Sequence, residues 1–152
     1  MTVMPEQIIV PTDGSETALR AAALAGAMAA PHGTCQVLLL YVISKQGEMP
    51  SELSGLGHDV SPGELRHGDR VEAEKALEAS AQKVREQGCT SVEPRIRVAH
   101  DAAAEIVEVV NATPGAMVVA GRRGLSTFRE LLVGSVSQKL IHHCRCPVTL
   151  VS

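Results

Sequence analysis

Short apolar runs alternate with longer segments of helical pattern along the chain. The runs are rich in aliphatic and β-branched residues and are bounded by glycine or proline, which is typical of buried strands. They cover Ile8–Thr12, Gln36–Ile43, Val92–Ala99, Ala116–Ala120 and Val148–Val151. The helical segments between them cover Thr17–Ala30, Asp69–Gln87, Ala102–Asn111 and Ser135–His143. This alternation predicts a doubly wound α/β fold, a parallel sheet of five strands with four helices on its two faces.

Local signals support several of these boundaries. Ser15 and Asp101 stand directly before predicted helices and are good N-cap residues. Val92–Ala99 alternates apolar with charged residues, which predicts a strand with one wetter face. We place that strand at an edge of the sheet, where Pro94 disturbs the fewest hydrogen bonds.

The chain length of 152 residues fits one domain, which we assign to residues 1–152. Ser44–Gly68 interrupts the alternation, because it is rich in Gly, Ser and Pro and lacks periodicity. We predict a variable loop there, of the length that is usually functional or mobile. Gly121–Val133 is predicted to be a second long loop.

Composition excludes several classes of function. Tyr41 and Phe128 are the two aromatic residues, so platforms for stacking nucleic-acid bases are missing. The net charge of −3 gives no basic footprint for nucleic acid or an anionic membrane. We see no signal peptide and no apolar stretch of about 20 residues, and we read the four cysteines as reduced thiols. A cytoplasmic protein that binds neither nucleic acid nor membrane is therefore expected.

A glycine pattern follows the fourth predicted strand. Gly121 and Gly124 flank a tight turn, and Gly134-Ser135 stands where the last helix begins. Glycines let a ligand approach the backbone closely, and the free N–H groups at a helix start favour phosphate. We therefore predict a phosphate-binding loop, although glycines of this kind also serve only to shape a loop.

Two further features lie at the ends of predicted strands. Asp13 follows the first strand, where ligands of doubly wound sheets bind, and its carboxylate could accept hydrogen bonds from ribose hydroxyls or help to hold a metal. Asp-Gly is also a common turn pair, which is the simpler interpretation of Asp13-Gly14. Tyr41-Val42 ends the second strand, and exposed backbone groups there could bind an adenine edge while Val42 packs on its face.

The sequence gives less support to other kinds of site. His142, His143, Cys144 and Cys146 lack the usual Cys-x2-Cys spacing of a zinc site. No Gly-Lys-Ser/Thr, no Gly-x-Gly-x-x-Gly and no Gly-x-Ser-x-Gly elbow is present, which argues against the Walker, Rossmann and α/β-hydrolase sites. Phosphate contacts by the side chains of Arg122, Arg123, Ser126 and Ser137 stay open.

Together these motifs resemble the universal stress protein family. The resemblance rests on Gly121-x2-Gly124-x9-Gly134-Ser135, on Ile9-Val10-Pro11-Thr12-Asp13-Gly14-Ser15, on Leu132 to Ser137, and on Cys146-Pro147-Val148. It spans nearly the whole chain outside Ser44–Gly68, and it resembles the ATP-binding members in particular. One departure is His100-Asp101-Ala102, where many members carry Gly-Asp-Pro.

The resemblance implies an adenine nucleotide α-hydrolase-like fold with strand order 3-2-1-4-5, counted along the predicted strands. It also implies ATP as ligand, with Mg²⁺ or Mn²⁺ bridging its phosphates, and a homodimer formed through the last strand, Pro147 to Val151. Asp13 would contact ribose, and the backbone of Val42 would contact adenine. The expected binding residues are Pro11, Thr12, Asp13, Val42, Ala120, Gly121, Arg123, Gly124, Gly134, Ser135, Val136 and Ser137.

Three functions are compatible with these residues. The first is a nucleotide-dependent stress-response and signalling module that acts on an unknown protein partner. The second is a slow ATPase or phosphoryl transferase, for which Asp13 is the one obvious acidic group near the expected phosphates. The third is a nucleotide-free structural or chaperone-like dimer. The glycine loop does not count phosphates, so AMP, ADP and cyclic nucleotides remain alternatives to ATP.

Overall fold

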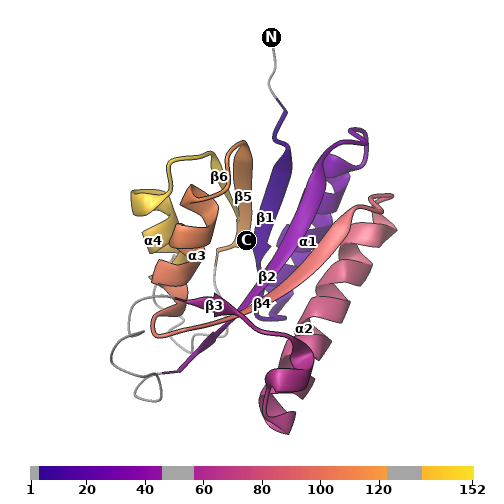
Figure 1. Ribbon diagram of the computed structural model, residues 1–152. Helices are drawn as coiled ribbons and strands as arrows, with labels where there is room; N and C mark the ends of the chain where they lie inside the picture. The colour runs from indigo at the N-terminus through magenta and orange to yellow at the C-terminus, as the bar shows by residue number, and fades with distance from the viewer. Residues whose placement is uncertain (1–3, 46–56, 123–134) are drawn as a thin grey trace.

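A computed structural model describes residues 4–45, 57–122 and 135–152 of the chain. One sheet runs through these residues with a pair of helices on each face (Figure 1). The strands are β1 (Gln7–Pro11), β2 (Gln36–Ser44), β3 (His58–Asp59), β4 (Val92–Ala99), β5 (Ala116–Gly121) and β6 (Val148–Val151). The helices are α1 (Glu16–Ala29), α2 (His67–Glu86), α3 (Ala102–Asn111) and α4 (Ser135–His143), with a short 3-10 helix η1 at Pro62–Glu64.

The sheet has the order β3-β4-β2-β1-β5-β6. Its five parallel strands, β4-β2-β1-β5-β6, have the predicted order and alternate with the four predicted helices. The expected α/β fold is thus confirmed.

The predicted count of five strands is wrong, because β3 adds an antiparallel sixth strand on the outer edge of β4. The described residues of the Ser44–Gly68 segment also contain η1, the last residue of β2 and the first two residues of α2. A two-residue strand is too short to show alternation in a sequence. It is held here by an ion pair between Asp59 and Arg97 of β4, whose atoms Oδ1 and Nη1 lie 2.8 Å apart.

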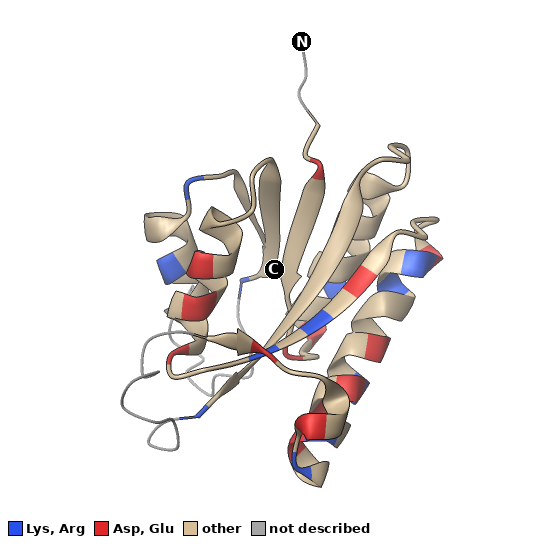
Figure 2. Ribbon diagram, in the orientation of Figure 1, with Lys and Arg blue, Asp and Glu red and all other residues tan. Residues whose placement is uncertain are grey.

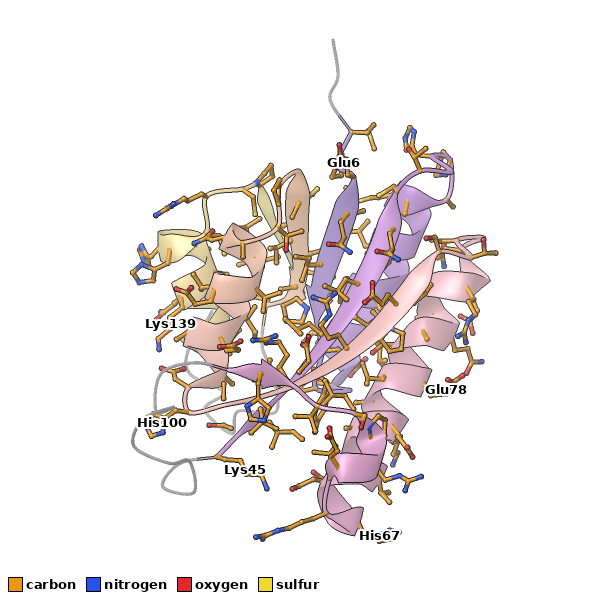
Figure 3. The ribbon with its side chains drawn as sticks, in the orientation of Figure 1. Glu6, Lys45, His67, Glu78, His100 and Lys139 are labelled. Carbon is orange, nitrogen blue, oxygen red and sulfur yellow. The ribbon has the colours of Figure 1, made fainter. Side chains whose placement is uncertain are left out.

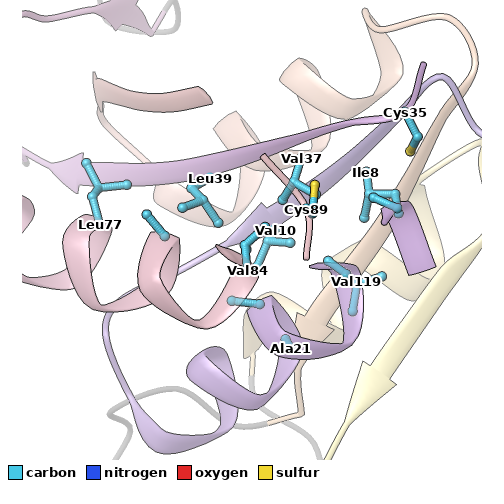
Figure 4. Close-up of a cluster of buried hydrophobic side chains, with 14 of the residues drawn as sticks. Ile8, Val10, Ala21, Cys35, Val37, Leu39, Leu77, Val84, Cys89 and Val119 are labelled. Atoms are coloured by element: carbon cyan, nitrogen blue, oxygen red, sulfur yellow. The ribbon is translucent and has the colours of Figure 1, made fainter. Parts of the chain in front are cut away.

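Helices α1 and α2 cover one face of the sheet through small side chains. Ala21 and Ala25 of α1 are fully buried, so the helix lies close to the strands. At Gly26, a Cβ atom would stand 2.7 Å from the carbonyl oxygen of Val84 in α2, so the two helices touch backbone to backbone. Figure 4 shows this core, in which aliphatic side chains of β1, β2 and β5 meet α1 and α2.

Helices α3 and α4 cover the opposite face. Ile9, Leu38 and Val118 point to this side and pack against Val110 of α3 and Leu140 of α4. The two central strands β1 and β2 are therefore buried on both faces for most of their length, which fits their continuous apolar sequence. None of the helices in the described residues is long and apolar enough to cross a membrane.

Candidate site at the carboxyl edge of the sheet

The predicted site residues come from strands that end at the same edge of the sheet. Pro11 of β1 pairs with Leu40 of β2 in the last pair of their register. Asp13 and Val42 each follow their member of this pair by two residues, so they lie at a similar height along the two strands. At this edge the chain leaves β1 toward α1 on one face and leaves β5 toward α4 on the other. Such a divergence is where doubly wound folds bind ligands. Figure 3 marks the edge by Lys45, which follows β2, and by His100, which follows β4.

Hydrogen bonds within the turn hold the exit from β1. The carboxylate of Asp13 accepts a bond from Ser15 N at 2.8 Å, and Thr12 Oγ1 accepts one from Gly14 N at 3.2 Å. Gly14 has φ of +79°, in the left-handed region that favours glycine. Ser15 then caps α1, its hydroxyl accepting from Ala18 N, as predicted. Asp13 is thus both a turn residue and a half-buried carboxylate at the edge where a ligand would lie.

Helix α2 packs against this turn through Ser80 and Ala76. The hydroxyl oxygens of Thr12 and Ser80 lie 2.8 Å apart, and both side chains are buried. A Cβ atom on Gly14 would stand 3.1 Å from the Cβ of Ala76, one helical turn before Ser80. Sequence reasoning missed Ser80, because a serine among alanines on a helix has no signal that reveals its partner.

The backbone of Val42 faces the space beyond the end of β1. Alternate residues of a parallel strand bond to opposite neighbours: Leu40 O accepts from Thr12 N on the β1 side, and Lys45 N donates to Ala99 O on the β4 side. Val42 follows Leu40 by two residues, so its N–H and C=O point to the β1 side. The register of β1 with β2 ends at Pro11 and Leu40. One donor and one acceptor therefore face the edge, level with Asp13.

Gly121 ends β5 in close contact with the start of α1. A Cβ atom there would stand 2.7 Å from Thr17 Oγ1 and 2.9 Å from Ala18 N. Its φ is not in the left-handed region, which among the described glycines is adopted by Gly14, Gly88 and Gly115. Packing against α1 therefore requires glycine at position 121, whatever a ligand requires.

Ser137 joins α4 to the end of β5. Its hydroxyl is buried and lies 3.0 Å from Gly121 O and 3.1 Å from Arg122 O, to which it donates. Arg122 N donates in turn to Val151 O at 2.7 Å, so the same few residues connect β5, β6 and α4. The structure therefore uses the Ser137 hydroxyl to fix the helix whose first N–H groups are the predicted phosphate site.

The remaining predicted contacts divide into two groups. Pro11 and Ala120 are buried at the ends of β1 and β5, and Val136 packs against the α3 and α4 core. Ser135 begins α4. Arg123, Gly124, Gly134 and Ser126 lie outside the described residues, so the central part of the glycine loop stays a prediction.

Acidic groups surround Tyr41 on the α1 and α2 side of this edge. Burial raises the pKa of the Tyr41 phenol, and the carboxylates of Glu72, Asp13 and Asp69 raise it further. Lys45 Nζ lies 3.1 Å from Asp69 Oδ2 and offsets part of this negative charge. Within the described residues no three His, Cys, Asp or Glu side chains are grouped to hold a metal ion.

A second polar cluster lies on the outer side of β4. The guanidinium of Arg97 donates to Glu105 Oε1, to Asp59 Oδ1 and to Gly57 O, and Glu105 is 6% exposed. The cluster attaches β3 to α3 beside an open hollow of about 350 Å³. The hollow is lined by Lys45, His58, Asp59, Val60, Glu64, Leu65, Arg66 and Val98. Elsewhere the charges of both signs are intermixed on the outer faces (Figure 2).

The cysteines form no disulfide in the described residues. Burial raises the pKa of the Cys144 thiol to about 11, with a smaller contribution from Cys146. Such a thiol is protonated at neutral pH and is a poor nucleophile and metal ligand.

Known proteins place the chain in a family. The model of the universal stress protein family matches residues 4–152. The chain belongs to the universal stress protein family. A universal stress protein of Thermus aquaticus is 30% identical over 149 residues, covering 97% of this chain and 99% of the relative.

Solved structures agree on the fold. A universal stress protein from Lactobacillus plantarum superposes with a TM-score of 0.77 at 21% identity, covering 99% of this chain and all of that one. A universal stress protein solved in complex with cAMP superposes with a TM-score of 0.68 at 24% identity, covering 97% of each chain. At these identities the likeness establishes the adenine nucleotide α-hydrolase-like fold.

Proposed function

We propose that this universal stress protein binds ATP at the carboxyl edge of its sheet and acts in the cytoplasm as a nucleotide-dependent stress-response module. The observation that carries the proposal is the backbone of Val42, whose N–H and C=O face the space beyond β1 at the level of Asp13. This donor and acceptor pair complements the edge of an adenine ring. The carboxylate of Asp13 lies in the turn after β1, at the same level of the sheet as Val42. It would accept hydrogen bonds from the hydroxyls of the ribose attached to the adenine.

The phosphates would extend from Asp13 toward α4. This helix begins at Ser135, and its first backbone N–H groups favour anions. Ser137 and the end of β5 hold the helix in place. Mg²⁺ or Mn²⁺ prefers oxygen ligands, so Asp13 and the phosphates themselves form a suitable donor set. The ion would neutralise phosphate charge close to the carboxylates near Tyr41.

The proposed role is binding and signalling, with turnover at most slow. Asp13 lies at the exit of β1, on the edge where the phosphates are expected, and its Oδ1 already accepts from Ser15 N. If the protein is an ATPase, steady phosphate release should disappear in Asp13→Ala.

Dimerisation belongs to the same proposal. β6 stands at the end of the sheet, and all four of its residues are half-buried in the single chain. An uncovered edge strand with Val148 and Leu150 is a site for pairing, so we propose that a second copy covers it. We also propose that a separate protein partner recognises the nucleotide-bound state.

The deciding experiment identifies the nucleotide that the purified protein carries. Freshly purified protein is denatured and the released small molecules are separated by chromatography against ATP, ADP, AMP and cAMP standards. Stoichiometric ATP is the expected result. Protein that carries no nucleotide is then titrated calorimetrically with ATP and Mg²⁺, and with cAMP because a relative was solved with that ligand. Failure of all of these to bind at millimolar concentration would favour the nucleotide-free dimer.

A further inference from the structure

Ser80 is a buried polar residue to which the proposed function gives no role. It lies within α2 with 0% of its surface exposed, in a row of alanines that pack on the sheet. Its hydroxyl oxygen lies 2.8 Å from Thr12 Oγ1, and this bond joins two residues 68 positions apart. A buried hydroxyl is costly unless it is hydrogen-bonded, so the pair specifies where α2 meets the exit of β1.

The contact reaches the turn through two points on one face of α2. Thr12 Oγ1, bonded to Ser80, also accepts from Gly14 N at 3.2 Å. Ala76, one helical turn earlier, leaves just enough space for Gly14, where an added Cβ would be 3.1 Å away. Asp13 lies between these two supported residues, and its carboxylate is oriented by Ser15 N.

We propose that Ser80 is a positioning residue for ribose recognition: through Thr12 it fixes the turn that presents the Asp13 carboxylate to the ribose hydroxyls. The inference rests on the proposed nucleotide site and extends it into α2. Without the Ser80 hydroxyl, Thr12 loses its buried partner and the turn gains freedom at the residue before Asp13. The effect should therefore appear in the recognition of the ribose rather than of the base or the phosphates.

The test compares two ligands that differ only in the ribose hydroxyls, ATP and 2′,3′-dideoxy-ATP, each with Mg²⁺. A hydrogen bond to a carboxylate distinguishes them, so the wild type should prefer ATP by about tenfold or more. In Ser80→Ala this preference should fall to about twofold, while the Kd of dideoxy-ATP changes by less than about twofold. A variant that is merely less stable would bind both ligands more weakly by the same factor.

Four further variants make the result specific. Thr12→Val removes the other hydroxyl and should reproduce the loss of preference, and Thr12→Ser keeps the hydroxyl and should retain it. The double variant Thr12→Val/Ser80→Ala should lose no more than either single variant, because both remove one interaction. Thr113→Ala is the matched control. It also removes a hydroxyl hydrogen bond of a half-buried threonine, from Thr113 Oγ1 to Val109 O at 2.7 Å, but at the opposite edge of the sheet, and it should keep the full preference.

The outcomes separate this inference from the proposed function. If the wild type binds neither ligand, the proposed function fails and the inference fails with it. If the wild type binds both ligands equally, nucleotide binding stands but Asp13 does not recognise ribose, and the inference is overturned. If Ser80→Ala keeps the wild-type preference, or loses affinity for both ligands equally, Ser80 is structural only and the inference is overturned while the proposed function stands.

Discussion

The segments that follow β1 and β5 both connect a strand to a helix, but their glycines serve different physical purposes. Each leads the chain from a buried strand toward a helix at the carboxyl edge, and each contains a glycine, Gly14 after β1 and Gly121 at the end of β5. At the β1 exit, Gly14 adopts φ of +79° and fits against Ala76. At the β5 exit, Gly121 has no left-handed conformation and instead makes room for the start of α1.

The comparison shows that a glycine motif can combine several physical demands. Gly14 is needed mainly for a backbone conformation and Gly121 for a close approach between two elements. Both would be retained in a protein that had lost its ligand, so neither glycine alone reports on nucleotide binding. Under the proposed function, the groups that would contact the nucleotide are polar: the backbone N–H and C=O of Val42 and the carboxylate of Asp13.

The largest effect is expected for Gly121→Ala. The added Cβ would stand 2.9 Å from two backbone atoms of α1, Ala18 N and Thr17 C, and backbone cannot move as a side chain can. We expect a loss of about 3 kcal/mol in the free energy of unfolding, measured by urea denaturation. Gly33→Ala is the matched control, because a Cβ at Gly33 meets nothing within 4 Å. Equal stability of the two variants would show that the contact with α1 is not tight.

Gly14→Ala should be less damaging than Gly121→Ala, with a loss of about 2 kcal/mol in the free energy of unfolding. The left-handed conformation costs an L-residue roughly 1–2 kcal/mol. The added Cβ would stand 3.1 Å from the Cβ of Ala76, which is a longer contact than those that Gly121→Ala makes with α1. The double variant Gly14→Ala/Ala76→Gly separates the two contributions. Removing the Ala76 methyl relieves the contact but leaves the conformational cost. In urea denaturation, the double variant should therefore lose less free energy of unfolding than the sum of the losses in the two single variants. Strict additivity would assign the whole effect to the backbone conformation.

Ser137→Ala tests how the β5 exit is held. The substitution leaves Gly121 O and Arg122 O without the hydroxyl that now donates to them, and we expect a loss of about 1 kcal/mol in the protein without nucleotide. Ser137→Thr keeps the donor and should lose less. If Ser137→Ala leaves the stability of the nucleotide-free protein unchanged but weakens ATP binding, the hydroxyl is a phosphate ligand rather than an anchor of α4.

The same comparison shows which features a sequence can predict. The five parallel strands were predictable, because β-branched runs and caps such as Asp101 are local signals, and α3 begins and ends at the predicted residues. The order of the strands was implied by the family resemblance and not by these local signals. The start of α2 was not, because Arg66 precedes it without a side-chain cap. Asp13, Val42 and Gly121 lie at one edge of the sheet, while their contacts with a ligand stay a prediction. Ser80 and the buried Glu105 were not found, because their partners, Thr12 and Arg97, lie on other elements and become neighbours only in the fold.

The smallest effect concerns a second attachment of α4, between Lys139 Nζ and Asp101 Oδ2 at 2.7 Å. The hydrogen bond from Lys139, and next that from Ala104 N, hold the pKa of Asp101 below its ordinary value. A carboxyl with a lowered pKa in the folded state stabilises the protein above its unfolded pKa, and that contribution is lost as the pH falls through the folded value. The pair is about half exposed, so its contribution is small, at most about 0.5 kcal/mol.

Asp101→Asn keeps a good N-cap for α3 and removes the charge, so it isolates this contribution. Urea denaturation should show the wild type slightly more stable than the variant at pH 7, with the difference shrinking below about pH 4 and also in about 1 M salt. A difference that grew on acidification would mean that the pKa of Asp101 is raised rather than lowered. A difference that changed with neither pH nor salt would not be electrostatic, and α4 would then be held at this end of the sheet by Ser137 rather than by charge.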